Sequence, residues 1–581
     1  MKNLLFISVI AVFFLSCEGL NQFPQDSIAP ETYFKTEADL RLFTNAMYHD
    51  ALPAGDGVYG EYVDNIIQYS VSDAIYGTRL VPTSDGGWSW GNLRRINLYL
   101  QNSYKCSSEA ARKRYDGVAR FFRAYFYLGM VQRFGDVPWY NEVIESNNTD
   151  ALQKPRDSRV LIVDSMLNDI NYAIANLPSN RTVNELSKWT ALAFKARICL
   201  YEGTFRKYHP EFNLPNADNL IRQAADAAYE LITNSGYSIY KETTTPYLNL
   251  FASINPIASE YILARSFSNE LSLRHNLNYY TLTASYGRPG LEKTLVNSYL
   301  TKAGTPFTDI PGYNTMQFYD EMQDRDPRLS QTIRTPGYTR IGETALLAPN
   351  FGYSVTGYHL IKFVTSSAYD TYIGSINAMP IFRYAEVLLN YAEAKAELGT
   401  LTQDDINISI KLLRDRVGMP NMNMANANDT PDPYMANQYP AVSGANKGVI
   451  LEIRRERGVE LVMEGFRWDD IMRWKAGALM IRTFKGMYFQ GVGEYDLDKN
   501  GTIDLVIYTG TKPSVSGATI LELGPEIVLE NGTNGGLVVI NGHINKVFNE
   551  NKDYLYPLPI QERLLNPNLK QNPGWVDGLD Y

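Results

Sequence analysis

The architecture of this chain is indicated most directly by one stretch, Arg383-Tyr-Ala-Glu-Val-Leu-Leu-Asn-Tyr-Ala-Glu-Ala-Lys-Ala-Glu-Leu-Gly399. Its apolar residues recur at steps of three and four, which predicts a helix over 383–398 with an apolar stripe and its glutamates on the other side. Gly399 suits the end of this helix, because glycine adopts the left-handed C-cap conformation without strain. The alanines leave little side-chain bulk, so neighbouring helices can approach closely, as in stacked helical hairpins. The stretch predicts packing and needs no catalytic group.

Length and charge exclude few fold classes but do bear on partners. The 581 residues allow two or three domains or one large solenoid-like body. A net charge of −9 argues against nucleic acid as a partner, because phosphate binding needs clustered Lys and Arg. The 41 tyrosines, against 5 histidines, fit ligand stacking, although tyrosine-rich helix packing explains them equally well.

The N-terminus has the pattern of a secretory signal peptide over residues 1–16. Lys2 precedes a compact apolar run over 4–15, which is shorter than the roughly 18 residues needed to cross a membrane. Cys17 follows directly and resembles the lipidated cysteine of a bacterial lipobox, although Phe14 replaces the usual leucine. An ordinary signal peptide followed by a chance cysteine is the alternative. The polar, proline-containing segment 17–32 is then a lipidated tether.

The rest of the chain divides by texture into four parts. Helical periodicity dominates 33–236 and returns in 383–478, whereas 237–382 is rich in Gly, Pro, Ser, Thr, Asn and Tyr and predicts loops with short strands. Residues 479–581 form a β-rich insert and a C-terminal tail. We therefore expect a predominantly α fold, a tetratricopeptide-like helical-hairpin scaffold with a loop-rich, partly β decorated region, although no clean fixed period proves a repeat array. Helices are expected at 38–52, 92–102, 107–134, 157–177, 188–206, 218–234, 383–398, 403–416 and 449–475, and strands at 504–508, 520–529 and 536–544.

Six blocks in order resemble the SusD/RagB family of outer-membrane lipoproteins from Bacteroidetes. They are the lipobox with Phe23–Phe34, Ala119–Leu128 running into Phe134–Pro138, Asp324–Leu329, the 383–399 helix, Ile453–Trp474, and the Pro-Leu-Pro-Ile with Asn-Pro-Gly-Trp ending. The resemblance covers essentially the whole chain. It implies a tetratricopeptide-like scaffold on the extracellular side of the outer membrane. It also implies a SusC-type TonB-dependent transporter as partner, over whose barrel the lipoprotein acts as a lid that delivers an oligosaccharide.

The charged block at 452–474 invites a catalytic interpretation. Glu456, Glu460 and Glu464 are spaced i, i+4, i+8, which places them on one helix face where arginine pairing is the ordinary explanation. A glycosidase would need two carboxylates roughly 5–10 Å apart across a sugar site. The resemblance to a non-catalytic family also disfavours an enzyme, so we expect no catalysis.

The run Asp496-Leu-Asp-Lys-Asn-Gly-Thr-Ile-Asp504 matches the start of a calcium loop. Its oxygen ligands would be the side chains of Asp496, Asp498, Asn500 and Asp504 and the carbonyl of Thr502. Ile507 stands where an EF-hand has a bidentate glutamate, and the flanks predict strands rather than helices. We therefore expect either a structural calcium ion or an ordinary Asp/Asn/Gly β-turn.

Ligand-binding candidates lie in two loops. The first comprises Asp73, Asp85, Trp88, Trp90 and Asn92, because sugars present C–H faces to aromatic rings and hydroxyls to polar side chains. The resemblance places Asp73 and one tryptophan near the ligand surface, although a Trp just before a helix is often a core residue.

The second loop offers Tyr286 and Arg288, for which a solvated turn is the alternative. The sequence thus predicts a cell-surface glycan-binding lipoprotein. A peptide-binding lipoprotein of a similar transporter and a surface glycoside hydrolase are the alternatives.

Overall fold

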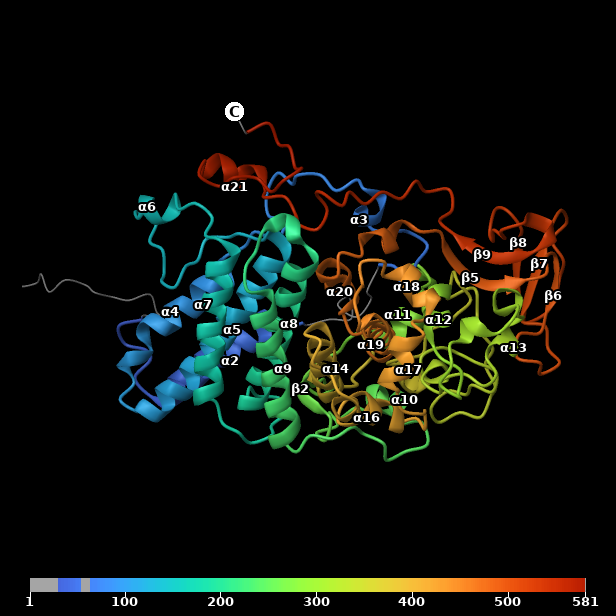
Figure 1. Ribbon diagram of the computed structural model, residues 1–581, viewed down its shortest axis with the longest axis horizontal. Helices are drawn as coiled ribbons and strands as arrows, with labels where there is room; N and C mark the ends of the chain where they lie inside the picture. Colours follow the sequence, from blue (N-terminus) through green and yellow to red (C-terminus); the bar gives the residue numbers. More distant parts are fainter. Residues whose placement is uncertain (1–29, 54–62, 580–581) are drawn as a thin grey trace, which may run out of the picture.

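The computed structural model describes residues 30–53 and 63–579, so the predicted signal peptide and Cys17 lie outside the described residues. The described chain is mostly helical with few short strands, which confirms the predicted fold class. Figure 1 shows long, stacked helices in one half of the molecule and loops with short strands in the other. None of the helices in the described ranges combines the length and hydropathy needed to cross a membrane.

Capping residues start several of the long helices. The Thr36 hydroxyl oxygen accepts a hydrogen bond from the Asp39 N–H, and the Asp39 carboxylate accepts one from the Thr36 N–H, a reciprocal capping box. Ser187 and Thr190 form a second capping box. The helices then pack in succession, α2 on α5, α5 on α7, α8 on α9, and α9 on α14. These helices are α2 (Glu37–Ala51), α4 (Gly91–Asn102), α5 (Glu109–Phe134), α7 (Arg159–Asn176), α8 (Lys188–Tyr208), α9 (Ala217–Asn234) and α14 (Tyr384–Glu397), with α3 (Asp73–Tyr76) and α6 (Thr149–Leu152) as short turns.

The loop-rich middle of the chain is joined to the scaffold by strand pairs between distant segments. Strand β2 pairs antiparallel with β4, which leads directly into α14, and β1 pairs antiparallel with β3. The elements here are β1 (Ile66–Ile67), α10 (Pro246–Ala252), β2 (Tyr261–Arg265), α11 (Leu277–Leu282), β3 (Gly290–Leu291), α12 (Lys293–Ser298), α13 (Phe318–Glu321) and β4 (Met379–Arg383).

Two long helices predicted near the C-terminal half are wrong, because each is interrupted. Residues 403–416 form α15 and α16, and 449–475 forms α19 and α20 with a turn at 461–466. Met463 and Gly465 adopt left-handed backbone conformations there, with φ of 63° and 81°, which a continuous helix cannot contain. The elements are α15 (Gln403–Asn407), α16 (Ile410–Asp415), α17 (Met424–Asp429), α18 (Pro433–Gln438), α19 (Lys447–Glu460) and α20 (Arg467–Arg473).

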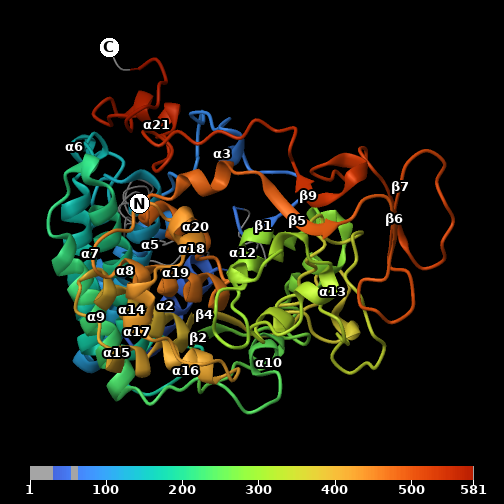
Figure 2. The same ribbon diagram turned by 45° about the vertical axis from the view of Figure 1, so that its right-hand side comes forward.

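The C-terminal part adds two small sheets and a final helix. One sheet pairs β5 with β9, and the other has the order β6-β7-β8, with β6 and β7 antiparallel. Figure 2 shows β6 and β7 at the side of the molecule, away from the long helices. The predicted strand 520–529 is shorter than expected. The elements are β5 (Phe484–Phe489), β6 (Gly493–Tyr495), β7 (Leu505–Tyr508), β8 (Thr519–Glu522), β9 (Gly536–Ile540) and α21 (Ile560–Leu565).

Helix α14 is buried on its polar side as well as on its apolar stripe. Glu386, Asn390 and Glu393 are each only 1% exposed, so the side opposite the stripe faces protein and not solvent. These groups are paired: Arg197 Nε lies 2.7 Å from Glu386, and Arg473 Nη2 lies 2.8 Å from Glu393. The buried alanines of the helix let α8, α9 and α19 pack around it.

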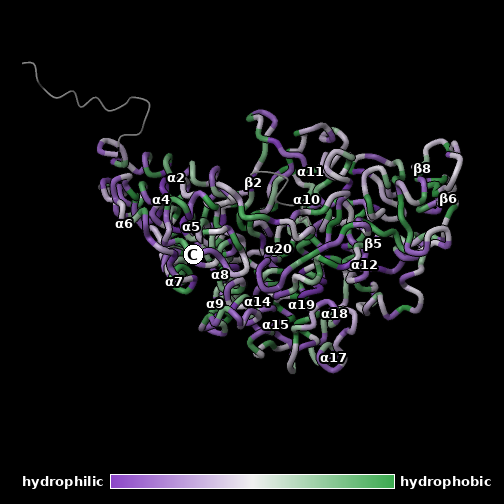
Figure 3. Tube along the Cα trace, turned by 90° about the horizontal axis from the view of Figure 1, so that it is seen from above, coloured by the Kyte–Doolittle hydropathy of each residue, from purple (hydrophilic) through white to green (hydrophobic). Residues whose placement is uncertain are grey.

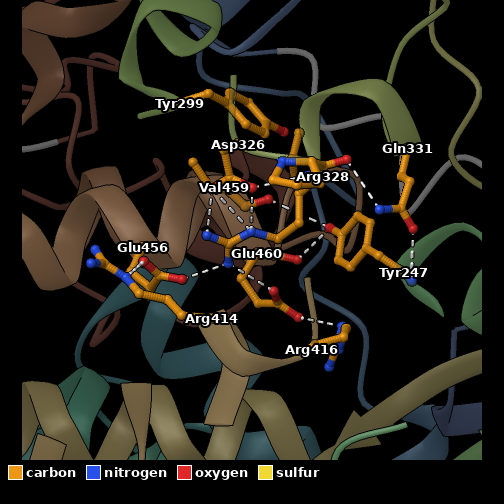
Figure 4. A network of polar contacts seen from close by, with 12 residues as sticks. Tyr247, Tyr299, Asp326, Arg328, Gln331, Arg414, Arg416, Glu456, Val459 and Glu460 are labelled. Atoms are coloured by element: carbon orange, nitrogen blue, oxygen red, sulfur yellow. Dashed lines mark hydrogen bonds and ion pairs between the residues drawn. The ribbon is translucent and has the colours of Figure 1, made fainter. Parts of the chain in front are cut away.

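A buried arginine–carboxylate network links α14 to its surroundings. Arg383, directly before α14, contacts Glu464 at 2.5 Å, Glu460 at 2.8 Å and Glu260 at 3.1 Å. Figure 4 shows Arg328 next to Glu456 and Glu460, with Arg414 and Arg416 contacting the same carboxylates. The prediction that these glutamates pair with arginines is confirmed, although Glu464 reaches the network from the turn after α19. Burial opposes the charge on Glu460, yet Arg416, Arg383 and Arg328 hold its pKa at about 2.

We expect Arg383→Met to destabilise the protein strongly, because it leaves Glu260, Glu460 and Glu464 buried without one of their partners. Breaking a buried pair in this way costs about 3–5 kcal/mol. Removing an exposed partner such as Lys113, which pairs with Glu109 on the surface of α5, should have little effect, because solvent screens this pair. Urea unfolding of both variants measures the difference, and equal losses would contradict a central role for the network.

Candidate functional site

Four tyrosines and one arginine from three distant segments form an exposed aromatic surface, here called the tyrosine surface. Tyr69 and Tyr372 are 70% and 63% exposed, and the other members are half-buried. Tyr69 follows β1, Tyr279 lies in α11, and Tyr372 lies in the turn 366–374. Tyr286 ends the short helical turn after α11, and Arg288 follows it. The members are Tyr69, Tyr279, Tyr286, Arg288 and Tyr372.

Three rings of the tyrosine surface form a contact chain, and Arg288 contacts the fourth. The Tyr279 ring lies 5.7 Å from that of Tyr372 and 6.1 Å from that of Tyr286, both edge to face. The Arg288 guanidinium lies 5.6 Å from the ring centre of Tyr69. The side chains therefore present aromatic faces, phenol groups and one cation from a single region.

Backbone and buried polar contacts hold these loops in position. The Tyr69 N–H donates to the Gly287 carbonyl at 2.8 Å, which joins the end of β1 to the loop before β3. Asn276 Nδ2 donates to the Tyr286 hydroxyl at 3.1 Å, and the Asn276 side-chain oxygen accepts from the Ile373 N–H. The surface is thus fixed by one buried asparagine that contacts two of its three segments.

An ion pair anchors the turn that carries Tyr372. Arg340 lies on another loop and donates to both carboxylate oxygens of Asp370, with 3.0 Å between Nη1 and Oδ2. Its Nε also donates to the Thr365 carbonyl. Because contacts hold the turn at both ends, the backbone of Tyr372 is fixed in position although its ring is exposed.

The two predicted tryptophans line a different place, here called the tryptophan pocket. This cavity of ≈580 Å³ lies between the start of α4, the 138–153 loop and α21. Trp88 is only 6% exposed and packs edge-on against Phe134, and Trp90 contacts Tyr140. Their rings therefore pack in the core and also line the pocket. The wall of the pocket is mainly apolar.

The polar candidates of the first loop have local partners. Asp85 adopts a left-handed conformation with φ of 58°, and its carboxylate accepts from the Gly87 N–H in a tight turn. Asn92 Nδ2 donates to the Asp50 carbonyl and so joins α4 to α2. Asp73 is exposed at the first residue of α3, four positions beyond Tyr69 in the sequence.

The structure therefore separates the two groups of predicted ligand residues. Figures 1 and 3 place α4, which follows the tryptophans, in the helical half and α11 on the other side of β2. Tyr286 and Arg288 belong to one surface, as their pairing in the sequence suggested. Sequence reasoning missed Tyr69, Tyr279 and Tyr372, and the available signal was the excess of tyrosine in the loop-rich region.

The predicted calcium loop joins β6 to β7 as a hairpin connection. One carboxylate oxygen from each of Asp496, Asp498 and Asp504 lies within 4.8 Å of the others. Burial and the neighbouring charges of Asp498 and Asp496 raise the pKa of Asp504 to about 6. Asn500 instead uses its side-chain oxygen to accept from the Thr502 N–H at 2.8 Å. The donor set is the all-oxygen kind that calcium prefers.

A further carboxyl group with a raised pKa is that of Asp469. Asp469 borders a polar cavity of ≈250 Å³, and burial together with the charge of Asp470 raises its pKa to about 6. Gln132 Nε2 donates to it at 2.8 Å. Two other carboxylates that border this cavity, Glu464 and Asp470, are in ion pairs with Arg383 and Arg457. A second free carboxylate for glycoside hydrolysis is not found among the described lining residues.

Stacked helical hairpins that carry a loop-built aromatic surface define the class of this protein as a helical scaffold with an exposed aromatic region. The SusD family model matches residues 259–575, more than half of the chain, so the chain belongs to the SusD family. The resemblance inferred from the six sequence blocks is thereby confirmed.

Relatives and solved structures agree with this assignment. SusD-like protein P2 of Formosa agariphila is 23% identical over 613 residues, which cover 98% of each chain. A SusD-like carbohydrate-binding protein of Bacteroides fragilis superimposes with a TM-score of 0.70 at 22% identity, covering 93% of this chain and all of that one. A laminarin-binding SusD-like protein gives 0.54 at 18% identity, with the same coverage.

Proposed function

We propose that this protein captures oligosaccharides at the tyrosine surface. The single observation that supports this is the contact of exposed aromatic rings with a guanidinium in one loop-built region. A sugar presents C–H groups that stack on tyrosine faces and hydroxyls that bond to phenols and to Arg288. Membership of the SusD family, in which a relative of similar fold is described as carbohydrate-binding, supports the same ligand class.

A binding role without catalysis fits the electrostatics better than hydrolysis does. The glutamates of α19 and of the turn after it are held by arginines, so they are poor proton donors. Asp469 is one group that a hydrolase hypothesis could use, because it borders a cavity and its pKa of about 6 suits a general acid. We therefore propose a non-catalytic protein, with peptide binding as the alternative that the same aromatic surface would allow.

We further propose that the captured glycan passes to a SusC-type TonB-dependent transporter, and that lipid on Cys17 anchors the protein to the outside of the outer membrane. Family membership and the lipobox-like sequence support both statements.

Ligand capture predicts that Tyr69→Ala and Tyr372→Ala each weaken glycan binding about tenfold, equivalent to roughly 1.4 kcal/mol. The matched control is Tyr104→Ala, because Tyr104 is 69% exposed on the helical half. Calorimetry with a panel of oligosaccharides and peptide mixtures measures the effect. Melting temperatures confirm that the variants fold.

Other outcomes would redirect the proposal. Loss of binding in Leu565→Arg, at the mouth of the tryptophan pocket, with Tyr69→Ala unaffected would move the site to that pocket. Tight binding of peptides alone would favour the peptide alternative. Sugar release that disappears in Asp469→Asn would establish a hydrolase.

The membrane proposal predicts that Cys17→Ala releases the protein from membranes of cells that lack the transporter, whereas the wild type stays bound. In cells with the transporter, a tagged wild-type protein should co-purify an outer-membrane barrel protein. If the variant remains fully membrane-associated without the transporter, lipidation at Cys17 is wrong.

We also propose that the 496–504 loop binds a structural calcium ion. Three carboxylates converge here, where burial first and then the charges of Asp498 and Asp496 raise the pKa of Asp504, and a divalent cation would favour the charged form of all three. The ion would stiffen the β6–β7 hairpin and take no part in chemistry.

Calcium should therefore raise the melting temperature of the wild type, and Asp498→Asn should abolish the increase. The matched control is Asp429→Asn on the surface of α17, which should keep it. Because protons compete for Asp504, whose pKa is about 6, calcium affinity should fall as the pH drops below 6. An unchanged melting temperature at any calcium concentration would identify the loop as an ordinary β-turn.

A further inference from the structure

A small cavity near the base of β1 has mainly arginines among its charged lining residues. Its volume is ≈20 Å³, and the charged residues that line it are one carboxylate and four arginines. These residues come from the segment before β1, from α19 and α20, and from the residue two positions before β5. They are Asp64, Arg454, Arg455, Arg467 and Arg482.

Arg454 is the least satisfied of these arginines. Its side chain is fully buried, and none of its three guanidinium nitrogens has a hydrogen-bond partner among the described residues. The carboxylate of Glu397 lies 3.5 Å from its Nη2, but that carboxylate already accepts from Lys207 and Tyr208 at 2.8 Å each. The centre of the Trp474 ring also lies 4.4 Å from its guanidinium carbon.

The neighbouring arginines carry further unpaired nitrogens. Arg455 Nε and Arg482 Nε are also buried without a hydrogen-bond partner in the described chain, although other nitrogens of both side chains are paired. Arg467 is satisfied by a bidentate contact with Asp64 at 2.6 and 2.7 Å. The one lining carboxylate is thus already occupied, while five guanidinium nitrogens on three lining residues lack an acceptor.

We propose that this cavity is a binding site for one halide ion, chloride under physiological conditions. A buried guanidinium nitrogen without an acceptor is destabilising, and an anion supplies an acceptor that several of these nitrogens can share. Water is a weaker match, because it brings no charge and accepts only two hydrogen bonds. Sulfate, phosphate and sugars are too large for a cavity of this volume, since one water molecule alone needs about 10–15 Å³.

The ion would secure the base of the strand that leads to the tyrosine surface. Asp64 and Asn65 immediately precede β1, and the Glu292 N–H donates to the Asn65 carbonyl at 2.9 Å. Arg482 also contacts Glu292 at 3.0 Å. An anion held by Arg454, Arg455 and Arg482 therefore lies where α19, the start of β1 and the start of α12 meet.

Bromide gives the direct test, because it replaces chloride and scatters anomalously. Crystals of the wild-type protein grown in or soaked with sodium bromide should show an anomalous peak in the cavity, within hydrogen-bond reach of Arg454. In solution, chloride and bromide should raise the melting temperature above its value in gluconate at the same ionic strength. Sulfate should not reproduce this increase.

Two variants test whether the halide-specific increase in melting temperature arises at this cavity. Arg454→Met removes the charge while keeping an unbranched side chain, and it should abolish the halide-specific increase. The matched control Arg222→Met, at an exposed position on α9, should retain it. If Arg454→Met fails to fold, the anomalous peak in the wild type still decides. No peak in the cavity, together with equal melting temperatures in halide and gluconate, would overturn the proposal and leave the site to water.

Discussion

The buried ion network around Arg383 is the constraint on which the rest of the structure depends. It brings together Glu260 before β2, Arg328 from the loop-rich region, Arg416 after α16 and Glu460 from α19. Each of these charges would be costly to bury alone, and each is tolerated because its partners arrive from other parts of the chain. The network therefore specifies one arrangement of segments far apart in sequence, in addition to the apolar packing that any set of helices could achieve.

The network lies between two parts of the molecule that are held together by different kinds of contact. On one side, long amphipathic helices pack through small residues and aromatic edges. On the other, backbone hydrogen bonds and asparagine side chains shape loops with little regular structure. The tyrosine surface belongs to the second kind, and its members reach it from β1, α11 and the turn before β4. A rigid scaffold below and ordered loops above are the usual way in which a binding surface is held in place.

The scaffold was predictable from the sequence because the apolar periodicity of a helix is visible within one short segment. Periodicity located α5, α8, α9 and α14, and the spacing of Glu456 and Glu460 correctly indicated arginine pairing. It failed at 461–466, where a residue without special propensity, Met463, takes a left-handed conformation that only the folded surroundings enforce. It also missed Tyr69, Tyr279 and Tyr372, since contacts between residues so distant in the chain leave no local pattern. Burial of the polar side of α14 was hidden for the same reason.

The turn that carries Tyr372 has a consequence for how this protein family can diversify. One ion pair, Arg340 with Asp370, and a few contacts of Asn276 and Asn278 tie residues 366–374 to the rest of the fold. Residues at its tip can therefore be exchanged, lengthened or shortened without disturbing the buried charges or the helices. Selection can change the tyrosine surface while the scaffold stays unchanged, so the ligand preference proposed for this surface can diverge faster than the fold.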